Sequence, residues 1–145
     1  GEDMADEAFF EDERAAEYMA ITNMTGIKPV LPRETYGYQV FYKMHRQLYG
    51  DEPSLYADYT YDATMVAILS VGVAGEYSGA RIKQAIPLVG QYYVGATGPK
   101  AMSAETGDLL LQDYLIWRVE KVDGQYRYNL NIGKWNIVAG VVWTG

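Results

Sequence analysis

The sequence predicts an α/β fold in which about four helices precede a β-rich C-terminal part. Apolar residues recur at steps of three and four between residues 3 and 90, which is the spacing of one helix face. From residue 91 onward the glycines gather and the apolar positions alternate, which is typical of strands. The 145 residues contain no internal repeat and are sufficient for one domain with its own core. We therefore expect a single domain, helical over 3–90 and β-rich over 91–145.

The first helix is expected over residues 3–20, with alanines on one side and acidic residues on the other. The acidic run at 11–13 is then a solvated helix face and not a metal site. Gly26 is available to end this region in a left-handed conformation. Pro29 and Pro32 should keep residues 27–33 extended. We interpret that segment as a connector crossing the surface.

Three further helices are expected before residue 90. The second spans about 35–49 and ends at Gly50, because Pro53 prevents its continuation. The third, about 61–74, is apolar all round, which predicts that it is covered on several sides. The fourth begins after Ser78, a suitable N-cap, and frays or ends near Pro87.

The C-terminal part is expected to consist of strands joined by turns. Residues 92–98 form a strand entering a turn, 103–108 have the composition of a turn, and 109–119 follow as a strand. Asp123 and Gly124 are a strong hairpin signal, after which residues 125–132 alternate cleanly. A last strand is expected over 137–143.

Composition excludes several classes of function. The net charge of −7 and the lack of a basic run argue against a nucleic-acid partner. The absence of cysteine rules out disulfides, thiolate metal sites and a cysteine nucleophile. No apolar stretch is long enough to span a bilayer. Tyrosine is abundant, with 14 residues against 3 Phe, and tyrosines suit both ligand clefts and half-buried strands.

No catalytic or metal-binding pattern emerges. The single histidine, His45, lies on the apolar stripe of the second helix and is expected to be packed there, not to act as a base. Residues 95–98, Gly-Ala-Thr-Gly, lack the lysine and following helix of a phosphate loop. Asp58 and Asp62 are four residues apart, and we interpret Asp62 as the cap of the third helix. We therefore expect neither an enzyme nor a cofactor or metal.

Residues 36–120 resemble the C-terminal part of type 1 periplasmic solute-binding proteins of the branched-chain amino acid (Leu/Ile/Val) transport family. The resemblance lies in the order and spacing of short pieces, which are residues 41–53, the Tyr-Asp-Ala at 61–63, and residues 74–75, 82–86, 93–98, 105–108 and 113–119. It implies a fold of two α/β lobes with the ligand held in the cleft between them. Residues 121–145 extend past the clear match, and the family suggests no role for Trp135 or Trp143.

The resemblance also implies what the whole protein would do. Members of the family are non-catalytic extracytoplasmic proteins that deliver a small amino-acid-like ligand to the permease of an ABC importer. They are more than twice as long as this chain, so we expect the chain to be a C-terminal fragment. The Ser, Thr and acidic residues that grasp the ligand in the family would lie in the part not present here.

One family position can be placed on this sequence. The resemblance puts a cleft-facing aromatic residue just before the Tyr-Asp-Ala helix start, which falls on Tyr56, with Tyr59 as the other candidate. An aromatic wall there would pack against an apolar or aromatic ligand side chain. The alternative is that both tyrosines only cover the helix 61–74.

Two other functions stay open. The same lobes occur as ligand-sensing ectodomains of receptors, which a neighbouring transmembrane helix and signalling domain would reveal. An incomplete lobe would also expose apolar surface and strand edges, so the fragment could be a self-associating homo-oligomer without ligand.

Overall fold

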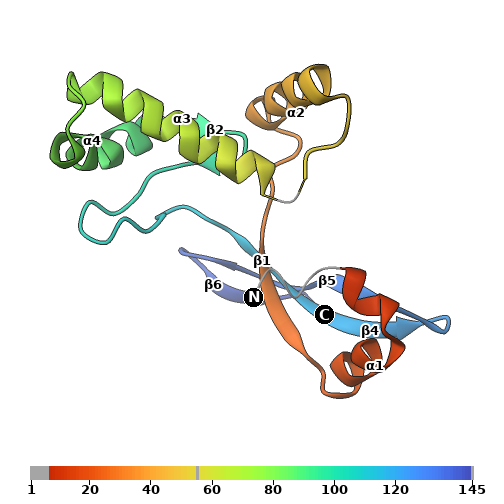
Figure 1. Ribbon diagram of the computed structural model, residues 1–145. Helices are drawn as coiled ribbons and strands as arrows, with labels where there is room; N and C mark the ends of the chain where they lie inside the picture. The colour runs from red at the N-terminus through yellow and green to blue at the C-terminus, as the bar shows by residue number, and fades with distance from the viewer. Residues whose placement is uncertain (1–6, 55, 145) are drawn as a thin grey trace. The chain divides into compact units, whose positions relative to one another are not determined.

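The computed structural model describes residues 7–54 and 56–144 (Figure 1). Its helices are the 3-10 helix η2 (Glu7–Glu11) and the α-helices α1 (Glu13–Ile21), α2 (Tyr36–Tyr49), α3 (Ala57–Ala74) and α4 (Gly79–Tyr92). The strands are β1 (Thr25–Pro29), β2 (Val94–Gly95), β3 (Gly98–Pro99), β4 (Tyr114–Val122), β5 (Gln125–Asn136) and β6 (Gly140–Trp143). The predicted α/β class, with four α-helices in the described residues and a β-rich end, is confirmed.

The chain forms two compact units. The sheet unit takes the described residues up to Val30 together with those from Gln112 on, and the helical unit runs from Leu31 to Leu111. The helical and β-rich parts predicted at 3–90 and 91–145 do not coincide with these units. The reason is that the early strand β1 pairs with the late strand β4.

The sheet unit is built on a four-stranded antiparallel sheet of order β1-β4-β5-β6. Residues 27–33 were predicted as a surface connector, but their first residues belong to β1, where Ile27 lies opposite Ile116. The prediction of extended backbone was right, and the pairing partner 89 residues later could not be inferred from local pattern. Tertiary pairing therefore turns the expected connector into an edge strand.

The core of the sheet unit lies between α1 and the sheet. Met19 packs with Trp117 and Val119, and all three side chains are almost fully buried. Gly26 does not cap a helix as expected, because α1 already ends at Thr22. Instead Gly26 lies opposite Trp117 in β1, and a Cβ at this position would collide with the indole ring. The glycine thus lets the backbone of β1 lie against the largest core side chain.

Turns join the strands of the sheet as predicted or within a few residues of the prediction. Asp123 and Gly124 have φ values of 52° and 84°, the left-handed pair of a type I′ hairpin turn. The last strand starts at Gly140 and not at residue 137. The reason is that Asn136 Oδ1 accepts hydrogen bonds from the Val138 and Ala139 backbone N–H groups, which holds residues 137–139 in a turn.

The N-terminal helix is shorter than expected and interrupted. In the described residues it consists of η2 and α1, separated by Asp12, whose side chain accepts a hydrogen bond from the Arg14 backbone N–H at 3.0 Å. Asp12 is thus the N-cap of α1. Residues 3–6 of the prediction lie outside the described residues.

In the helical unit the ends of α2 and α3 follow the sequence signals. Thr35 caps α2, and Gly50 and Gly75 end α2 and α3 with φ values of 81° and 71°. The start of α3 differs, because the helix begins at Ala57, four residues before the prediction. Asp62 is therefore one turn inside α3 and does not cap it.

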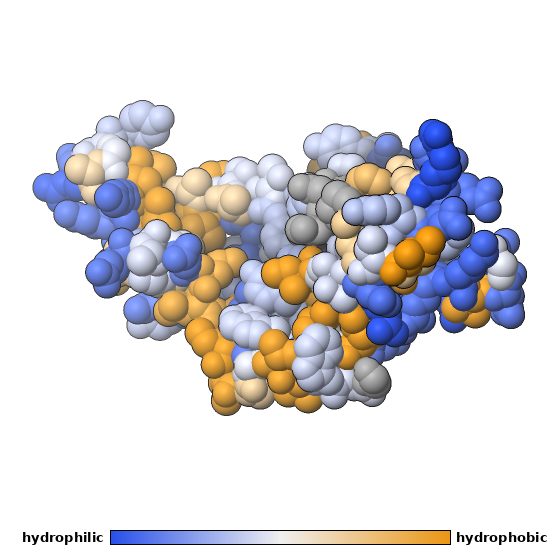
Figure 2. Space-filling model, turned by 90° about the horizontal axis from the view of Figure 1, so that it is seen from below, coloured by the Kyte–Doolittle hydropathy of each residue, from blue (hydrophilic) through white to orange (hydrophobic). Residues whose placement is uncertain are grey.

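The burial pattern of α3 is the reverse of the one expected. Its buried residues are Asp58, Asp62, Val66 and Ser70, whereas Ile68 and Val73 are about 60% exposed. Within the described residues the helix is thus not covered on several sides. Three of the four buried side chains of α3 are polar, whereas several of its apolar side chains are exposed. The space-filling view shows orange patches of exposed apolar residues on the face of the molecule that it presents (Figure 2).

Helix α4 does not end at Pro87. It continues to Tyr92 with the proline inside, although an interior proline costs about 3 kcal/mol. The last turns are held by packing, because a Cβ at Gly90 would lie 2.5 Å from the Lys100 carbonyl oxygen. Close approach of α4 to the segment after β3 therefore outweighs the local preference of Pro87 for a helix end.

Candidate functional site

Tyr56 occupies an unusual backbone conformation at the start of α3. It is the N-cap residue, with φ 67° and ψ 2°, and its side chain makes no capping hydrogen bond. A left-handed conformation is costly for a bulky residue, and Ser, Thr, Asp or Asn at an N-cap would stabilise the helix by about 1 kcal/mol more than a side chain that cannot cap. Residues held against such preferences cluster at functional sites. The position is therefore a candidate on physical grounds as well as by resemblance.

The two tyrosines singled out in the sequence lie together. The rings of Tyr56 and Tyr59 are 6.2 Å apart, edge to face. Tyr56 is 36% exposed and Tyr59 is half-buried. They face different cavities, since Tyr56 lines one of about 500 Å³ between α2 and α3 and Tyr59 lines one of about 420 Å³ on another side of α3.

The larger cavity, which we call the α2–α3 cavity, has an aromatic lining. Five of its lining side chains are rings, namely Phe41, His45, Tyr49, Tyr56 and Tyr61. His45 is half-buried between Phe41 and Tyr49, with ring centroids at 5.9 and 4.8 Å. The histidine is thus packed in the helix stripe, as its sequence position indicated.

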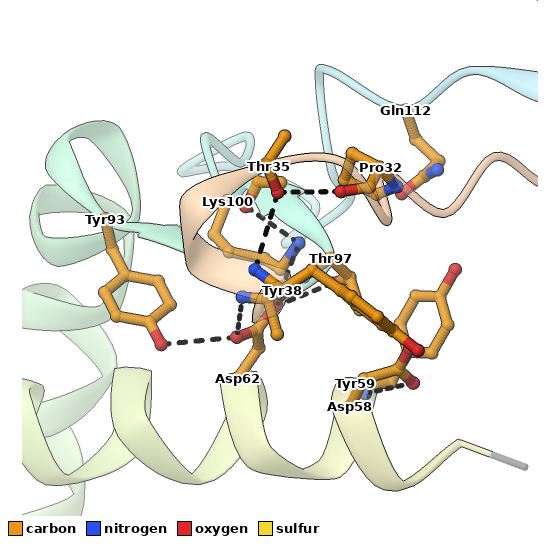
Figure 3. A network of polar contacts seen from close by, with 12 residues as sticks. Pro32, Thr35, Tyr38, Asp58, Tyr59, Asp62, Tyr93, Thr97, Lys100 and Gln112 are labelled. Carbon is orange, nitrogen blue, oxygen red and sulfur yellow. Dashed lines mark hydrogen bonds and ion pairs between the residues drawn. The ribbon is translucent and has the colours of Figure 1, made fainter. Parts of the chain in front are cut away.

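One turn into α3, Asp62 anchors the turn between β2 and β3 (Figure 3). Its carboxylate accepts hydrogen bonds from the Ala96 N–H at 2.7 Å, the Thr97 N–H at 2.8 Å and the Thr97 hydroxyl at 2.7 Å. The Tyr93 hydroxyl donates to it at 3.3 Å, and the Lys100 ammonium lies 3.5 Å away. Asp62 and Thr97 are both nearly inaccessible to solvent. The network fastens α3 to the segment that follows α4.

Burial shapes the electrostatics of this network. Desolvation lowers the pKa of Lys100, although its attraction to Asp62 opposes that shift. Desolvation also raises the pKa of Tyr93, and the neighbouring Asp62 carboxylate raises it further. One turn earlier, burial raises the pKa of Asp58, against the stabilising hydrogen bond from the Tyr59 N–H. Burial in this region therefore disfavours the charged forms of Lys100, Tyr93 and Asp58.

Sequence reasoning did not find this network, although it considered the residues involved. The Gly-Ala-Thr-Gly segment at 95–98 was examined as a phosphate loop and rejected. Its N–H groups do bind an oxyanion, but that oxyanion is the Asp62 carboxylate of the same chain. Gly95 is required there because a Cβ would collide with the Asp62 carboxylate. The sequence feature that could have indicated this network is an acidic residue, Asp62, in an otherwise apolar helix, followed later in the chain by a turn flanked by Gly95 and Gly98.

Other kinds of site receive no support from the geometry. In the described ranges 7–54 and 56–144, no three His, Asp or Glu side chains lie together as metal ligands would. No single described helix has the length and apolarity needed to cross a membrane, while the pair α3 and α4, bent by 115°, passes on length and composition alone.

No protein-family model matches the sequence. No curated protein matches it either. Among solved structures, the chain is similar to a leucine-binding protein from Thermotoga maritima, with a TM-score of 0.56 and 21% sequence identity. The match covers 81% of this chain and 32% of that chain, so this chain spans about a third of the length of the protein it matches. The fold of the chain is therefore similar to that of about a third of this leucine-binding protein, in keeping with the predicted fold class.

Proposed function

We propose that this chain is part of a non-catalytic solute-binding protein for a small amino-acid-like ligand. Tyr56 would form an aromatic wall against the ligand side chain, supported by its edge-to-face contact with Tyr59. The observation that carries the proposal is the conformation of Tyr56. Its backbone is in the costly left-handed region, its side chain makes no capping hydrogen bond, and its ring is partly exposed. The fold likeness is consistent with this role.

The same proposal includes the context of the protein. The complete protein would have two lobes, of which this chain forms a C-terminal portion, and would work outside the cytoplasm with the permease of an ABC importer. The difference in length from the matched leucine-binding protein supports this view. Groups for the charged ends of an amino acid would then come from the remaining part of the protein, because the lining of the α2–α3 cavity contains no Asp, Glu, Lys or Arg.

Titration calorimetry tests the proposal with leucine, isoleucine, valine and phenylalanine. We expect no heat of binding with the 145-residue chain and clear binding with a longer chain that includes the preceding lobe. In the longer chain, Tyr56→Ala should weaken binding about tenfold or more, since it removes a ring from the ligand side chain, whereas the exposed Tyr77→Ala should not. Tight binding by the 145-residue chain alone would contradict the view that part of the site is missing.

A further inference from the structure

The α2–α3 cavity is lined by residues of α2, of α3 and of the loop between them. The loop that joins them holds Ser54, which lines the cavity. The cavity is open to the surface and measures about 500 Å³, within the range of small-molecule pockets. All of the described residues that line it belong to the helical unit.

A continuous row of rings forms one side of this cavity. Tyr61 from α3 contacts Phe41 at 5.2 Å, and Phe41, His45 and Tyr49 follow one another at four-residue steps along α2. Met44, which is 38% exposed, adds a polarisable sulfur to the lining. Rings and thioethers both favour aromatic partners over aliphatic ones. The lining is thus suited to a flat aromatic molecule.

Among the described residues, the lining of the cavity has no charged group that could pair with an ionic ligand. None of the described side chains that line it is Asp, Glu, Lys or Arg. Arg46 and Glu52 lie in neighbouring parts of the chain, but they pair with each other at 3.4 Å, and the Tyr42 hydroxyl also donates to Glu52 at 2.7 Å. Burying an unpaired ion is costly, so a ligand of this cavity should be neutral.

One polar atom of the lining lacks a partner. His45 Nδ1 is shielded from solvent and has no hydrogen bond with any described residue. Nδ1 accepts a hydrogen bond in the tautomer that carries its proton on Nε2, and a buried polar atom left unpaired costs free energy. The hydroxyls of Ser54 and Thr60 also line the cavity. A ligand with an N–H or O–H donor could therefore form a hydrogen bond with this lining.

We propose that the α2–α3 cavity binds a neutral aromatic small molecule that carries a hydrogen-bond donor, of the indole or phenol class. This goes beyond the proposed function, because the ammonium and carboxylate of an amino acid would find no charged partner in this lining. The α2–α3 cavity would act in the 145-residue chain by itself. A failure of this cavity to bind an aromatic ligand in the 145-residue chain can therefore be separated from a failure of amino-acid binding in the longer protein.

The test is a titration of the isotope-labelled 145-residue chain with indole, benzofuran and benzoate, followed by amide chemical shifts. Indole should bind with a Kd on the order of 0.1 mM, which lies within the affinity range of ligands of its size, and should shift the amides of α2 and the start of α3. Benzofuran, which lacks the donor, should bind several-fold more weakly. Benzoate, which is charged, should bind at least tenfold more weakly.

Two variants locate the site. Thr60→Phe adds a ring at an exposed helical position of the lining and should abolish indole binding while leaving the fold intact. His45→Phe keeps the row of rings but removes the acceptor, so it should bring indole and benzofuran to the same affinity. Tyr77→Ala, at a 93% exposed position that lines neither this cavity nor the groove around Leu88, is the matched control and should leave indole binding unchanged.

Four results would overturn the proposal. They are the absence of indole binding at millimolar concentration, equal affinity for benzoate, unchanged binding in a folded Thr60→Phe variant, and shifts confined to the groove around Leu88. Equal affinity for indole and benzofuran in the unaltered chain would show that the ligand needs no hydrogen-bond donor, contrary to that part of the proposal. Folding of each variant is checked by its amide spectrum and thermal unfolding before titration.

Discussion

The carboxylate of Asp62 joins two elements that are otherwise separate in the sequence. It takes three hydrogen bonds from the Ala96 and Thr97 groups and pairs with the ammonium of Lys100, all in buried surroundings. Removing one member of such a buried pair leaves the other charge without compensation, which costs about 3–5 kcal/mol. Asp62 is therefore the residue whose replacement should affect the helical unit most.

We expect Asp62→Asn to lower the free energy of unfolding by about 3 kcal/mol or more. The amide cannot accept with both of its terminal atoms and carries no charge for Lys100. Urea unfolding followed by circular dichroism measures the change. Asp108→Asn, in an exposed turn, is the matched control and should stay within about 0.5 kcal/mol of the unaltered chain. A loss below 1 kcal/mol for Asp62→Asn would show that the network contributes little.

Asp58 should make stability depend on pH in the acidic range. Burial raises its pKa in the folded state above the ordinary value of 3.8, so between these two pKa values the native state binds more protons than the unfolded state. Stability contributed by this group is then present below pH 3.8 and is lost as the pH rises through the raised pKa.

Replacing Asp58 by Asn should remove this dependence. The variant should be more stable than the unaltered chain at pH 7, with the advantage shrinking as the pH falls towards 3.5. Thermal unfolding at a series of pH values measures it, with Asp51→Asn as the exposed control. An advantage that is the same at pH 3.5 and pH 7 would exclude titration of Asp58 as its cause.

At the scale of elements, two glycines in different environments make a matched pair. Gly26 in β1 lies against the Trp117 ring, whereas Gly72 in α3 has no atom within 4 Å of the place where a Cβ would be. Gly26→Ala should cost about 1–3 kcal/mol through overpacking and loosen the β1–β4 pairing. Gly72→Ala should stabilise α3 by up to about 1 kcal/mol, because alanine is the better helix former.

Denaturant unfolding of both variants measures these opposite signs. The tryptophan fluorescence of the Gly26→Ala variant should also change, since Trp117 is 1% exposed in the unaltered chain. If Gly26→Ala were neutral, the edge strand β1 would have to move freely away from the core, contrary to its place opposite Trp117.

At the scale of the whole molecule, the most prominent unexplained surface is a groove between α3 and α4. Leu69, Val73, Leu88 and Tyr92 line it, and they are 42–87% exposed. Exposed apolar patches of this kind commonly mark interaction sites. Because residues 63–75 contain no charged side chain, two copies could approach there without like-charge repulsion from α3.

We expect the 145-residue chain to self-associate through this groove. Sedimentation velocity across a hundredfold concentration range should show a rising average mass, which added salt does not reduce. Leu88→Lys should shift the chain to monomer, whereas Tyr77→Lys, at a 93% exposed position outside the groove, should not. A monomer at all concentrations would contradict this expectation.

Much of the fold could be predicted because its signals are local. Gly50 and Gly75 end helices since only glycine takes the left-handed conformation at little cost, and Asp123 with Gly124 specifies a tight hairpin by the same reasoning. These features depend on backbone conformations of one or two residues. They needed no knowledge of the rest of the chain.

The remaining features depend on contacts between distant residues. The pairing of β1 with β4, the course of α4 through Pro87 and the burial of Asp62 against residues 96 and 97 all require the folded chain. Sequence pattern alone placed Asp62 at a helix cap, because an acid near a helix start is ordinarily a cap. Only the approach of the β2–β3 turn gives that carboxylate its donors.

The candidate site combines both kinds of information. The sequence by itself indicated that aromatic residues gather where α3 begins. Its resemblance to a family pointed to Tyr56 and Tyr59, whose part in ligand binding stays a prediction. The tertiary structure decided that Tyr56 adopts a left-handed conformation, that the two tyrosine rings line different cavities, and that α2 and α3 line a cavity between them. The physical reason is that residue types fix local preferences, whereas a cavity arises only from how elements pack.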